Sequence, residues 1–330
     1  MDTKVRVGVL GLGKHARNKI LPALRAVSDT LEVTSLCTRN ASVLAELGST
    51  YDSATFSDPR ELLDYGALDV VYISGPQSLH EEWSAAALSA GKHVWCEKAL
   101  ASTTEGWQRL IALAHASGLA LCETWQFPYH PQFLGLTDFL RSGRLGRMLE
   151  VDAVFTVPHF PDRTNFRYQK DLGGGAFLDL ASYTLRMAAL LAGPTPREIE
   201  ASIGTEAGFE VDTHGSATLT YDDGVVCRLR WGFGFEYRNQ LHVRGELGEL
   251  VVPFAFTKQA AQETEIRWSP HAGNGEVFKF APADPFVEMF KVYEATITSP
   301  TARSRQWTVL DEQAQLLASV HEALSRADRR

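Results

Sequence analysis

The sequence predicts an α/β protein with an N-terminal, doubly wound parallel sheet of the Rossmann type and a C-terminal α+β domain with a large, mainly antiparallel open sheet. Over residues 1–122, continuously apolar strand-like runs alternate with helical stretches, which is typical of a parallel sheet covered on both faces. Over residues 123–330, strand-like runs follow one another without helices between them, as in an antiparallel sheet. A length of 330 residues also suits two domains.

The first domain shows clear signals for where its helices begin and end. Pro22 lies inside a helical stretch, so we expect a kink or a new first turn there. Asp58 and Pro59 are typical of a helix cap and its first turn, and Gly91 is typical of a helix end. The predicted strands cover 5–10, 32–38, 69–74, 92–96 and 119–122, and the predicted helices cover 14–27, 42–47, 79–90 and 103–117.

The second domain is expected to open with a helix and then to consist mainly of strands. The glycines 173–175 precede a long helical stretch that extends to about Ala192. The Asp-Asp-Gly segment 222–224 separates two alternating runs, which predicts a β-hairpin. The other predicted helices cover 132–142, 284–298 and 311–327, and the predicted strands include 149–157, 216–221 and 225–231.

Composition excludes several classes of protein. The net charge of −8, from 32 basic and 40 acidic residues, disfavours nonspecific nucleic-acid binding. No apolar run approaches the ~20 residues that span a bilayer, and the first residues lack the apolar core of a signal peptide. The four scattered cysteines suggest neither a disulfide framework nor a metal site. We therefore expect a soluble, cytoplasmic protein without a bound metal.

A dinucleotide-binding pattern follows the first predicted strand. Gly11, Gly13 and Ala16 match G-x-G-x-x-G/A, with Lys14 and His15 between them. In this pattern the first glycine allows a tight turn, the second lets a pyrophosphate approach the backbone, and the small third residue lets the helix pack on the strand. A purely structural turn is the alternative, but the strand-to-helix context favours nucleotide binding.

The end of the second predicted strand indicates which dinucleotide is bound. NAD sites usually place a carboxylate there for the adenosine ribose, whereas this chain has Thr38 and Arg39. Both side chains can bind a 2′-phosphate, and an arginine can also stack on adenine. A solvated arginine is the alternative, and we favour NADP(H) over NAD(H).

Several motifs in a fixed order strongly resemble the Gfo/Idh/MocA family, the glucose–fructose oxidoreductase and inositol dehydrogenase group. They are the strand 69–74 followed by Pro76 and His80, the segment 90–100 with Glu97 and Lys98, and the segments 123–131, 165–167 and 173–179. The resemblance covers nearly the whole chain. It implies hydride transfer between a nicotinamide ring and a carbinol or carbonyl carbon, usually of a sugar or polyol. It also implies cofactor contacts for Pro76, His80, Glu97 and Lys98, and dimer or tetramer contacts through the second sheet.

The chain departs from the family pattern at three places. Ala99 replaces a proline after Lys98, and Pro128 stands where many members have an arginine. Tyr183 stands where many members have a histidine, and Ala181 replaces a common glycine. Tyrosine also occurs at this position in dihydrodiol dehydrogenases, glucose–fructose oxidoreductase and some nucleotide-sugar ketoreductases of the family.

These residues predict a proton relay. Asp179 and Tyr183 are four residues apart on one helix face. A phenol, with an ordinary pKa near 10, needs a nearby cation to exchange protons at pH 7, and Lys98 suits this role. Asp179 would hold the lysine or a substrate hydroxyl. A core aromatic is the alternative for Tyr183.

Two further residues leave alternatives open. Arg167 either contacts the nicotinamide amide or a substrate phosphate, or forms a loop salt bridge. His80 either contacts the nicotinamide ribose or caps its helix, and its place at the carboxyl end of a strand favours the former.

The leading interpretation is an NADP(H)-dependent sugar oxidoreductase of the 1.1.1 class that reduces a keto-sugar. Segments 232–239 and 245–248 also resemble ketoreductases of nucleotide-linked sugars, so a sugar or a sugar nucleotide is the expected substrate. One alternative is a free-sugar or trans-dihydrodiol dehydrogenase, and a non-catalytic NADP-sensing regulator is another. Trp231, Phe233 and Phe235 suggest an apolar sheet face that supports a homodimer or homotetramer.

Overall fold

The computed structural model describes residues 4–327, so residues 1–3, on which the signal-peptide expectation partly rests, lie outside the described part. The chain divides into two compact units, each made of two segments. The first unit comprises Met1–Trp125 and Phe286–Asp311, and the second comprises Gln126–Pro285 and Glu312–Arg330.

This division differs from the predicted one, because a segment near the C-terminus returns to the first unit. The predicted boundary at residues 122/123 lies close to Trp125, but the predicted second domain wrongly includes 286–311. The reason is apolar packing: the Phe290 ring lies 5.7 Å from the rings of both Tyr72 and Trp95. This returning segment therefore completes the core of the first unit.

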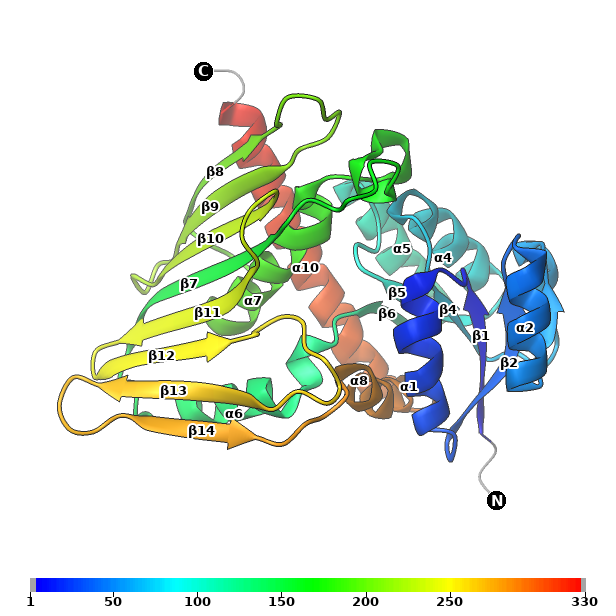
Figure 1. The fold of residues 1–330 in the computed structure, drawn as a ribbon, viewed down its shortest axis with the longest axis horizontal. Helices are drawn as coiled ribbons and strands as arrows, with labels where there is room; N and C mark the ends of the chain where they lie inside the picture. Colours follow the sequence, from blue (N-terminus) through cyan, green and yellow to red (C-terminus); the bar gives the residue numbers. More distant parts are fainter. Residues whose placement is uncertain (1–3, 328–330) are drawn as a thin grey trace. The chain divides into compact units, whose positions relative to one another are not determined.

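The first unit contains the predicted parallel sheet, with six strands in the order β3-β2-β1-β4-β5-β6. This is the doubly wound order in which ligands bind where the strand order reverses, here between β1 and β4. Figure 1 shows helices packed around this sheet. The strands are β1 (Val5–Leu10), β2 (Leu31–Cys37), β3 (Ala54–Phe56), β4 (Val70–Ile73), β5 (His93–Glu97) and β6 (Leu121–Thr124). The helices are α1 (Leu21–Ala26), α2 (Ala41–Tyr51), α3 (Pro59–Leu63), α4 (His80–Ser89), α5 (Thr104–Ser117), α8 (Pro285–Tyr293) and α9 (Ala295–Thr298).

Local sequence signals explain where these helices begin. A π-helical turn over Ala16–Ile20 precedes α1, and Pro22 occupies the first turn of α1, as predicted. Asp58 caps α3 by accepting a hydrogen bond from the Arg60 amide at 2.8 Å. The short strand β3 was not predicted, because its three residues are not fully buried and carry little apolar signal.

The second unit contains an eight-stranded sheet in the order β14-β13-β12-β11-β7-β10-β9-β8. All neighbouring strands are antiparallel except β7 and β10, which are parallel. The strands are β7 (Met148–Val157), β8 (Glu198–Gly204), β9 (His214–Thr220), β10 (Val226–Phe233), β11 (Arg238–Gly245), β12 (Gly248–Pro253), β13 (Thr264–Pro270) and β14 (Glu276–Phe280). The helices are α6 (Pro131–Arg141) and α7 (Ser182–Ala192), and a further helix, α10 (Pro300–Ala327), contributes residues to both units. In Figure 1, α6 and α7 lie behind the sheet, and β9 and β10 form the predicted hairpin.

The two faces of the second sheet differ from the prediction. Trp231 and Phe233 are only 1% exposed and pack within the unit, whereas Phe235 is 49% exposed. The opposite face carries charged side chains: Glu150 is ion-paired with both Arg228 and Arg244. Strand alternation explains this, since Arg228 and Arg230 point away from the buried residues of β10. The expected apolar outer face was wrong, and a homo-oligomer built through this sheet stays a prediction.

Candidate active site

The turn after β1 has the shape that a dinucleotide pyrophosphate requires. Gly11 has a φ of +92°, and an added Cβ would lie 1.6 Å from the Ser74 carbonyl oxygen, so only glycine fits there. An added Cβ at Gly13 would meet no protein atom within 4 Å, so the fold itself does not require glycine at this position. Ala16 is fully buried and lets the next helix pack closely. These residues therefore fit a bound dinucleotide.

The turn after β2 lies next to the glycine turn. The Gly11 amide donates a hydrogen bond to the Cys37 carbonyl at 2.9 Å, which links the ends of β1 and β2. The Asn40 side chain caps α2 by accepting from the Val43 amide at 3.2 Å. Arg39 is exposed between these two anchors. The turn is therefore fixed by its neighbours, while the Arg39 side chain extends toward solvent, as binding a 2′-phosphate requires.

The structure brings two predicted cofactor residues together at the end of β5. Glu97 Oε1 lies 2.9 Å from His15 Nε2, which comes from the glycine turn, and also accepts from the Tyr72 hydroxyl. Burial alone would raise the pKa of Glu97, but the nearby His15 and the Tyr72 hydrogen bond lower it to about 2. Glu97 is therefore an ionised carboxylate that links the end of β5 to the glycine turn.

Lys98 lies in a backbone segment that is held on both sides. The peptide bond between Lys98 and Ala99 is cis, at the position where the resembling family has proline. The Ala99 carbonyl lies 2.7 Å from His80 Nδ1, and the Leu100 amide donates to Glu123 Oε1 at 2.9 Å. The half-buried lysine thus extends from a backbone fixed by two side chains of the same unit.

Glu123 was not predicted as a site residue. It is 2% exposed and also accepts a hydrogen bond from Trp125 Nε1 at 2.8 Å. The sequence contains one signal that could have identified Glu123, which is a carboxylate inside the otherwise uncharged strand Leu121–Thr124. A charge is almost never fully buried unless it is paired, so such a residue is expected to have a specific partner.

Both ring nitrogens of His80 face backbone carbonyl oxygens. Its Nε2 lies 3.1 Å from the Gly75 carbonyl, in addition to the contact of Nδ1 with Ala99, and its side chain is buried. Burial lowers the pKa of His80, so the neutral ring donates a hydrogen bond to one of these two carbonyls and only lies against the other. The ring therefore links the segments around Pro76 and Lys98 rather than capping α4 through its side chain. Contacts of His80 and Pro76 with a cofactor stay predictions.

In the second unit, Arg167 pairs with the predicted catalytic carboxylate. Arg167 Nε donates to Asp179 Oδ2 at 2.6 Å, and its guanidinium also lies over the rings of Phe160 and Phe166. Burial opposes the charge of Arg167, but the Asp179 carboxylate outweighs it and raises the pKa of Arg167. We expected Asp179 to hold a lysine or a substrate hydroxyl. Arg167 thus forms the salt bridge that we gave as one alternative, and contacts of Arg167 and Asp179 with a cofactor or substrate stay predictions.

Tyr183 lies one helical turn beyond Asp179, in the first turn of α7. It is 7% exposed and has aromatic neighbours: its ring lies 5.2 Å from Phe155, 6.0 Å from Phe256 and 6.2 Å from Phe127. These contacts fix the ring against the sheet. Asp179, which is ion-paired with Arg167, lies four residues earlier on the same run of helix, so the tyrosine and this pair belong to the same helix end.

Asp212 is the second residue that the sequence analysis missed. Its Oδ2 accepts from the Phe177 amide at 2.7 Å, and its carbonyl accepts from the Ala176 amide at 2.9 Å. A Cβ added at Gly175 would lie 2.3 Å from Asp212 Oδ1, so the glycine leaves room for this carboxylate. Burial raises the pKa of Asp212 to about 6. Asp212 therefore anchors the start of the helical segment that carries Asp179.

Within residues 4–327, no group of three or more His, Cys, Asp or Glu side chains is arranged to hold a metal ion. None of the helices in that range combines the length and the apolar character needed to cross a bilayer.

Comparisons with known proteins give consistent results along the chain. The model of the oxidoreductase family with an NAD-binding Rossmann fold matches residues 5–124, and the Gfo/Idh/MocA C-terminal domain matches residues 133–251. A dTDP-3,4-didehydro-2,6-dideoxy-α-D-glucose 3-reductase of Saccharopolyspora spinosa is 36% identical over 269 residues, which are 81% of this chain and 80% of the relative. A protein of the same description from Actinomadura kijaniata is 33% identical over 306 residues, covering 92% of this chain and 90% of the relative.

A solved structure extends the likeness to three dimensions. The 3-ketoreductase from Actinomadura kijaniata, in complex with NADP and TDP-benzene, has a TM-score of 0.92 with this chain at 31% identity, and the match covers 98% of both chains. The same 3-ketoreductase has been solved with a lysine replaced by alanine and with a tyrosine replaced by phenylalanine.

Proposed function

Because the chain belongs to the Gfo/Idh/MocA family of oxidoreductases, we propose that it is a 3-ketoreductase of a dTDP-linked deoxysugar. It is an NADP-dependent enzyme that transfers a hydride between nicotinamide and a carbonyl or hydroxyl carbon of a sugar. The identity of the sugar, the carbon and the reductive direction are our proposal. The observation that carries it is the match over 98% of both chains to a 3-ketoreductase in complex with NADP and TDP-benzene.

The cofactor residues of the proposal come from the first unit. The backbone around Gly11 and Gly13 would hold the pyrophosphate, and Thr38 and Arg39 would hold the 2′-phosphate. When bound, NADPH supplies the hydride of the reduction. The exposed position of Arg39, together with the absence of a carboxylate among residues 38–40, supports this assignment.

The proton of the reduction is assigned to Tyr183. Its phenol donates a proton to the ketone oxygen as the carbonyl carbon becomes a carbinol, and Lys98 supplies the positive charge that stabilises the resulting phenolate and the substrate oxygen. The ion pair between Arg167 and Asp179 positions the helix segment that precedes Tyr183. Solvent then returns a proton to the phenolate after turnover.

The test is a spectrophotometric assay of NADPH oxidation with dTDP-3,4-didehydro-2,6-dideoxy-α-D-glucose. We expect turnover with NADPH, and slower turnover with NADH at the same concentration. Oxidation of a free sugar or a trans-dihydrodiol with NADP⁺, without reduction of the nucleotide-linked ketone, would instead support a dehydrogenase. Binding of NADPH without turnover of any of these substrates would support a regulator.

The remaining expectations are part of the same proposal. We expect a homodimer or homotetramer that acts in the cytoplasm on small molecules, without nucleic-acid or membrane partners. The net charge of −8 supports the exclusion of nonspecific nucleic-acid binding.

A further inference from the structure

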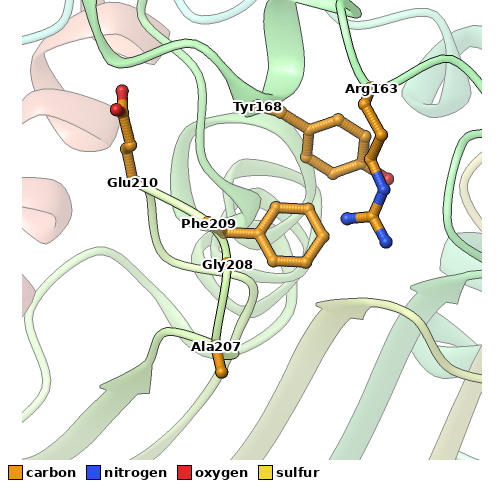
Figure 2. A pocket seen from close by; sticks show the side chains of 6 residues that line it. All are labelled: Arg163, Tyr168, Ala207, Gly208, Phe209 and Glu210. Atoms are coloured by element: carbon orange, nitrogen blue, oxygen red, sulfur yellow. The ribbon is translucent and has the colours of Figure 1, made fainter.

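A pocket in the second unit is not used by the residues assigned above. It has a volume of about 410 Å³ and is lined by Arg163, Tyr168, Ala207, Gly208, Phe209 and Glu210. We call it the Arg163 pocket (Figure 2). It lies between the loop that follows β7 and the loop that joins β8 to β9. Its volume is within the range of about 300–1,000 Å³ that is typical of small-molecule sites.

The walls of the pocket are aromatic and are held in place. The rings of Tyr168 and Phe209 lie 4.8 Å apart, and His159 stacks on Phe209 at 5.2 Å with an interplanar angle of 15°. The Tyr168 hydroxyl accepts from the Phe160 amide at 2.8 Å. His159 Nε2 lies 2.9 Å from a Glu206 carboxylate oxygen, which ties the two loops together. The rings are therefore positioned before any ligand arrives.

Arg163 adds a cation to these rings. Its guanidinium carbon lies 4.4 Å from the centre of the Phe209 ring and 5.8 Å from that of Tyr168. In Figure 2 the guanidinium lies beside Phe209, whereas the Glu210 side chain points away from that ring. Stacking uses the flat face of a guanidinium, and its N–H groups at the edge stay available for phosphate oxygens.

The pocket is connected to a candidate catalytic residue of the same unit through the chain. Tyr168, a wall of the pocket, directly follows Arg167 in the chain, and Arg167 is ion-paired with Asp179. For a ligand that reaches both the pocket and Tyr183, the aromatic walls and the Arg163 cation favour an aromatic, negatively charged end joined to a reactive end.

We propose that the Arg163 pocket binds the pyrimidine nucleoside diphosphate portion of the substrate. The base packs against the edge of the Tyr168–Phe209 ring pair, beside the Arg163 guanidinium that covers the Phe209 ring, and the N–H groups of Arg163 bind the diphosphate. This inference rests on the proposed function, because it assigns the nucleotide end of that substrate to named residues.

A second pocket of the same unit is less suited to this role. It has a volume of about 470 Å³, and its lining includes Tyr237, Arg238 and Phe254. Its arginine faces the Glu236 carboxylate at 3.8 Å, which offsets the positive charge that a diphosphate requires.

The experiment measures dTDP binding by titration calorimetry for the full chain and four variants. Arg163→Ala removes the cation, Phe209→Leu removes the aromatic face but keeps apolar bulk, and Tyr237→Ala probes the second pocket. The matched control is Arg144→Ala, because Arg144 is also a solvent-accessible arginine stacked on aromatic rings, those of Phe139 and Phe278. Circular dichroism checks that each variant is folded.

We expect Arg163→Ala and Phe209→Leu to weaken dTDP binding about 5- to 140-fold, since a stacked base contributes about 1–3 kcal/mol and each 1.4 kcal/mol is tenfold. With the nucleotide-linked substrate they should raise KM more than they lower kcat. Arg144→Ala and Tyr237→Ala should bind dTDP like the unsubstituted protein. NADPH affinity should be the same in all variants, which separates the substrate nucleotide from the cofactor nucleotide.

Three results would overturn the inference. If Arg163→Ala and Phe209→Leu bind dTDP as tightly as Arg144→Ala does, or if only Tyr237→Ala loses binding, the nucleotide lies elsewhere while the proposed function stands. If the variants lose NADPH affinity instead, the pocket serves the cofactor. If the unsubstituted protein does not bind dTDP and turns over only free sugars, the proposed function and this inference both fail.

Discussion

Asp212 anchors the start of the helical segment that precedes Tyr183. Replacing it by asparagine tests whether the ionised carboxylate destabilises the folded state. The pKa of Asp212 is raised from 3.8 to about 6 by burial. Each pKa unit corresponds to about 1.4 kcal/mol, so ionisation of Asp212 destabilises the folded state by about 3 kcal/mol. An asparagine has nearly the same shape and keeps an oxygen that can accept from the Phe177 amide, but it carries no charge.

The sign of the effect follows from the raised pKa. Between about pH 4 and pH 6 the folded state binds the proton more tightly than the unfolded state, so the contribution of Asp212 to the free energy of unfolding falls as pH rises through this range. Asp212→Asn should therefore be more stable than the unsubstituted protein by about 1.5 kcal/mol at pH 5 and by about 3 kcal/mol at pH 7.5. Other titrating groups cancel in the difference between the two proteins.

Urea unfolding at pH 5 and pH 7.5, followed by fluorescence, measures both free energies. The matched control is Asp58→Asn, because Asp58 also accepts from a backbone amide at a helix start, in a hydrogen bond that is exposed to solvent, and asparagine and aspartate are nearly equivalent as helix caps. A variant at Asp212 that is no more stable at pH 7.5, or whose advantage does not shrink toward pH 5, would refute the reasoning.

Three further predictions concern the cofactor, the proton and the assembly. NADPH should bind about 10- to 100-fold tighter than NADH, because hydrogen bonds to a charged group contribute about 1.5–3 kcal/mol each. Arg39→Ala should lose much of this preference, and equal affinities of the unsubstituted protein for the two cofactors by calorimetry would contradict the prediction. Tyr183→Phe should lower kcat about 10²- to 10⁴-fold with NADPH affinity nearly unchanged, and Lys98→Ala should be at least as damaging; near-normal turnover of Tyr183→Phe would return Tyr183 to a packing role. If the homo-oligomer forms through the charged sheet face, sedimentation should show that it dissociates more readily as salt rises and in Arg244→Ala, whereas a monomer at micromolar concentration in low salt argues against it.

The parallel sheet of the first unit was predictable because its signals are local. The apolar run of β4, the Asp58–Pro59 cap and the turn at Gly11 each depend on a few adjacent residues. The lengths of the helices and the presence of the three-residue strand β3 were harder to predict from the sequence, because tertiary packing rather than local preference defines them.

Features that depend on distant residues were missed or misjudged. Arg167 was predicted near the site, but its pairing with Asp179 depends on how a loop folds back on a helix. Asp212 precedes β9 in a segment without a motif, and it acts on a helix start 35 residues earlier in the chain. We placed Trp231 on an outer face because the residues of its strand alternate between two faces of the sheet. This alternation separates the two faces but does not indicate which of them is covered by the rest of the unit.

The return of residues 286–311 to the first unit has a consequence for how the protein is synthesised and folds. Trp95, which is fully buried, contacts Phe290 and Tyr293, so its burial depends on residues made long after the Rossmann strands have left the ribosome. Domains that are continuous in sequence can fold one after another during synthesis, whereas this first unit must wait for the intervening segment 126–285. A fragment that ends at residue 125 would therefore expose apolar surface that the whole chain covers, and the nascent first unit would be open to aggregation until the last quarter of the chain emerges.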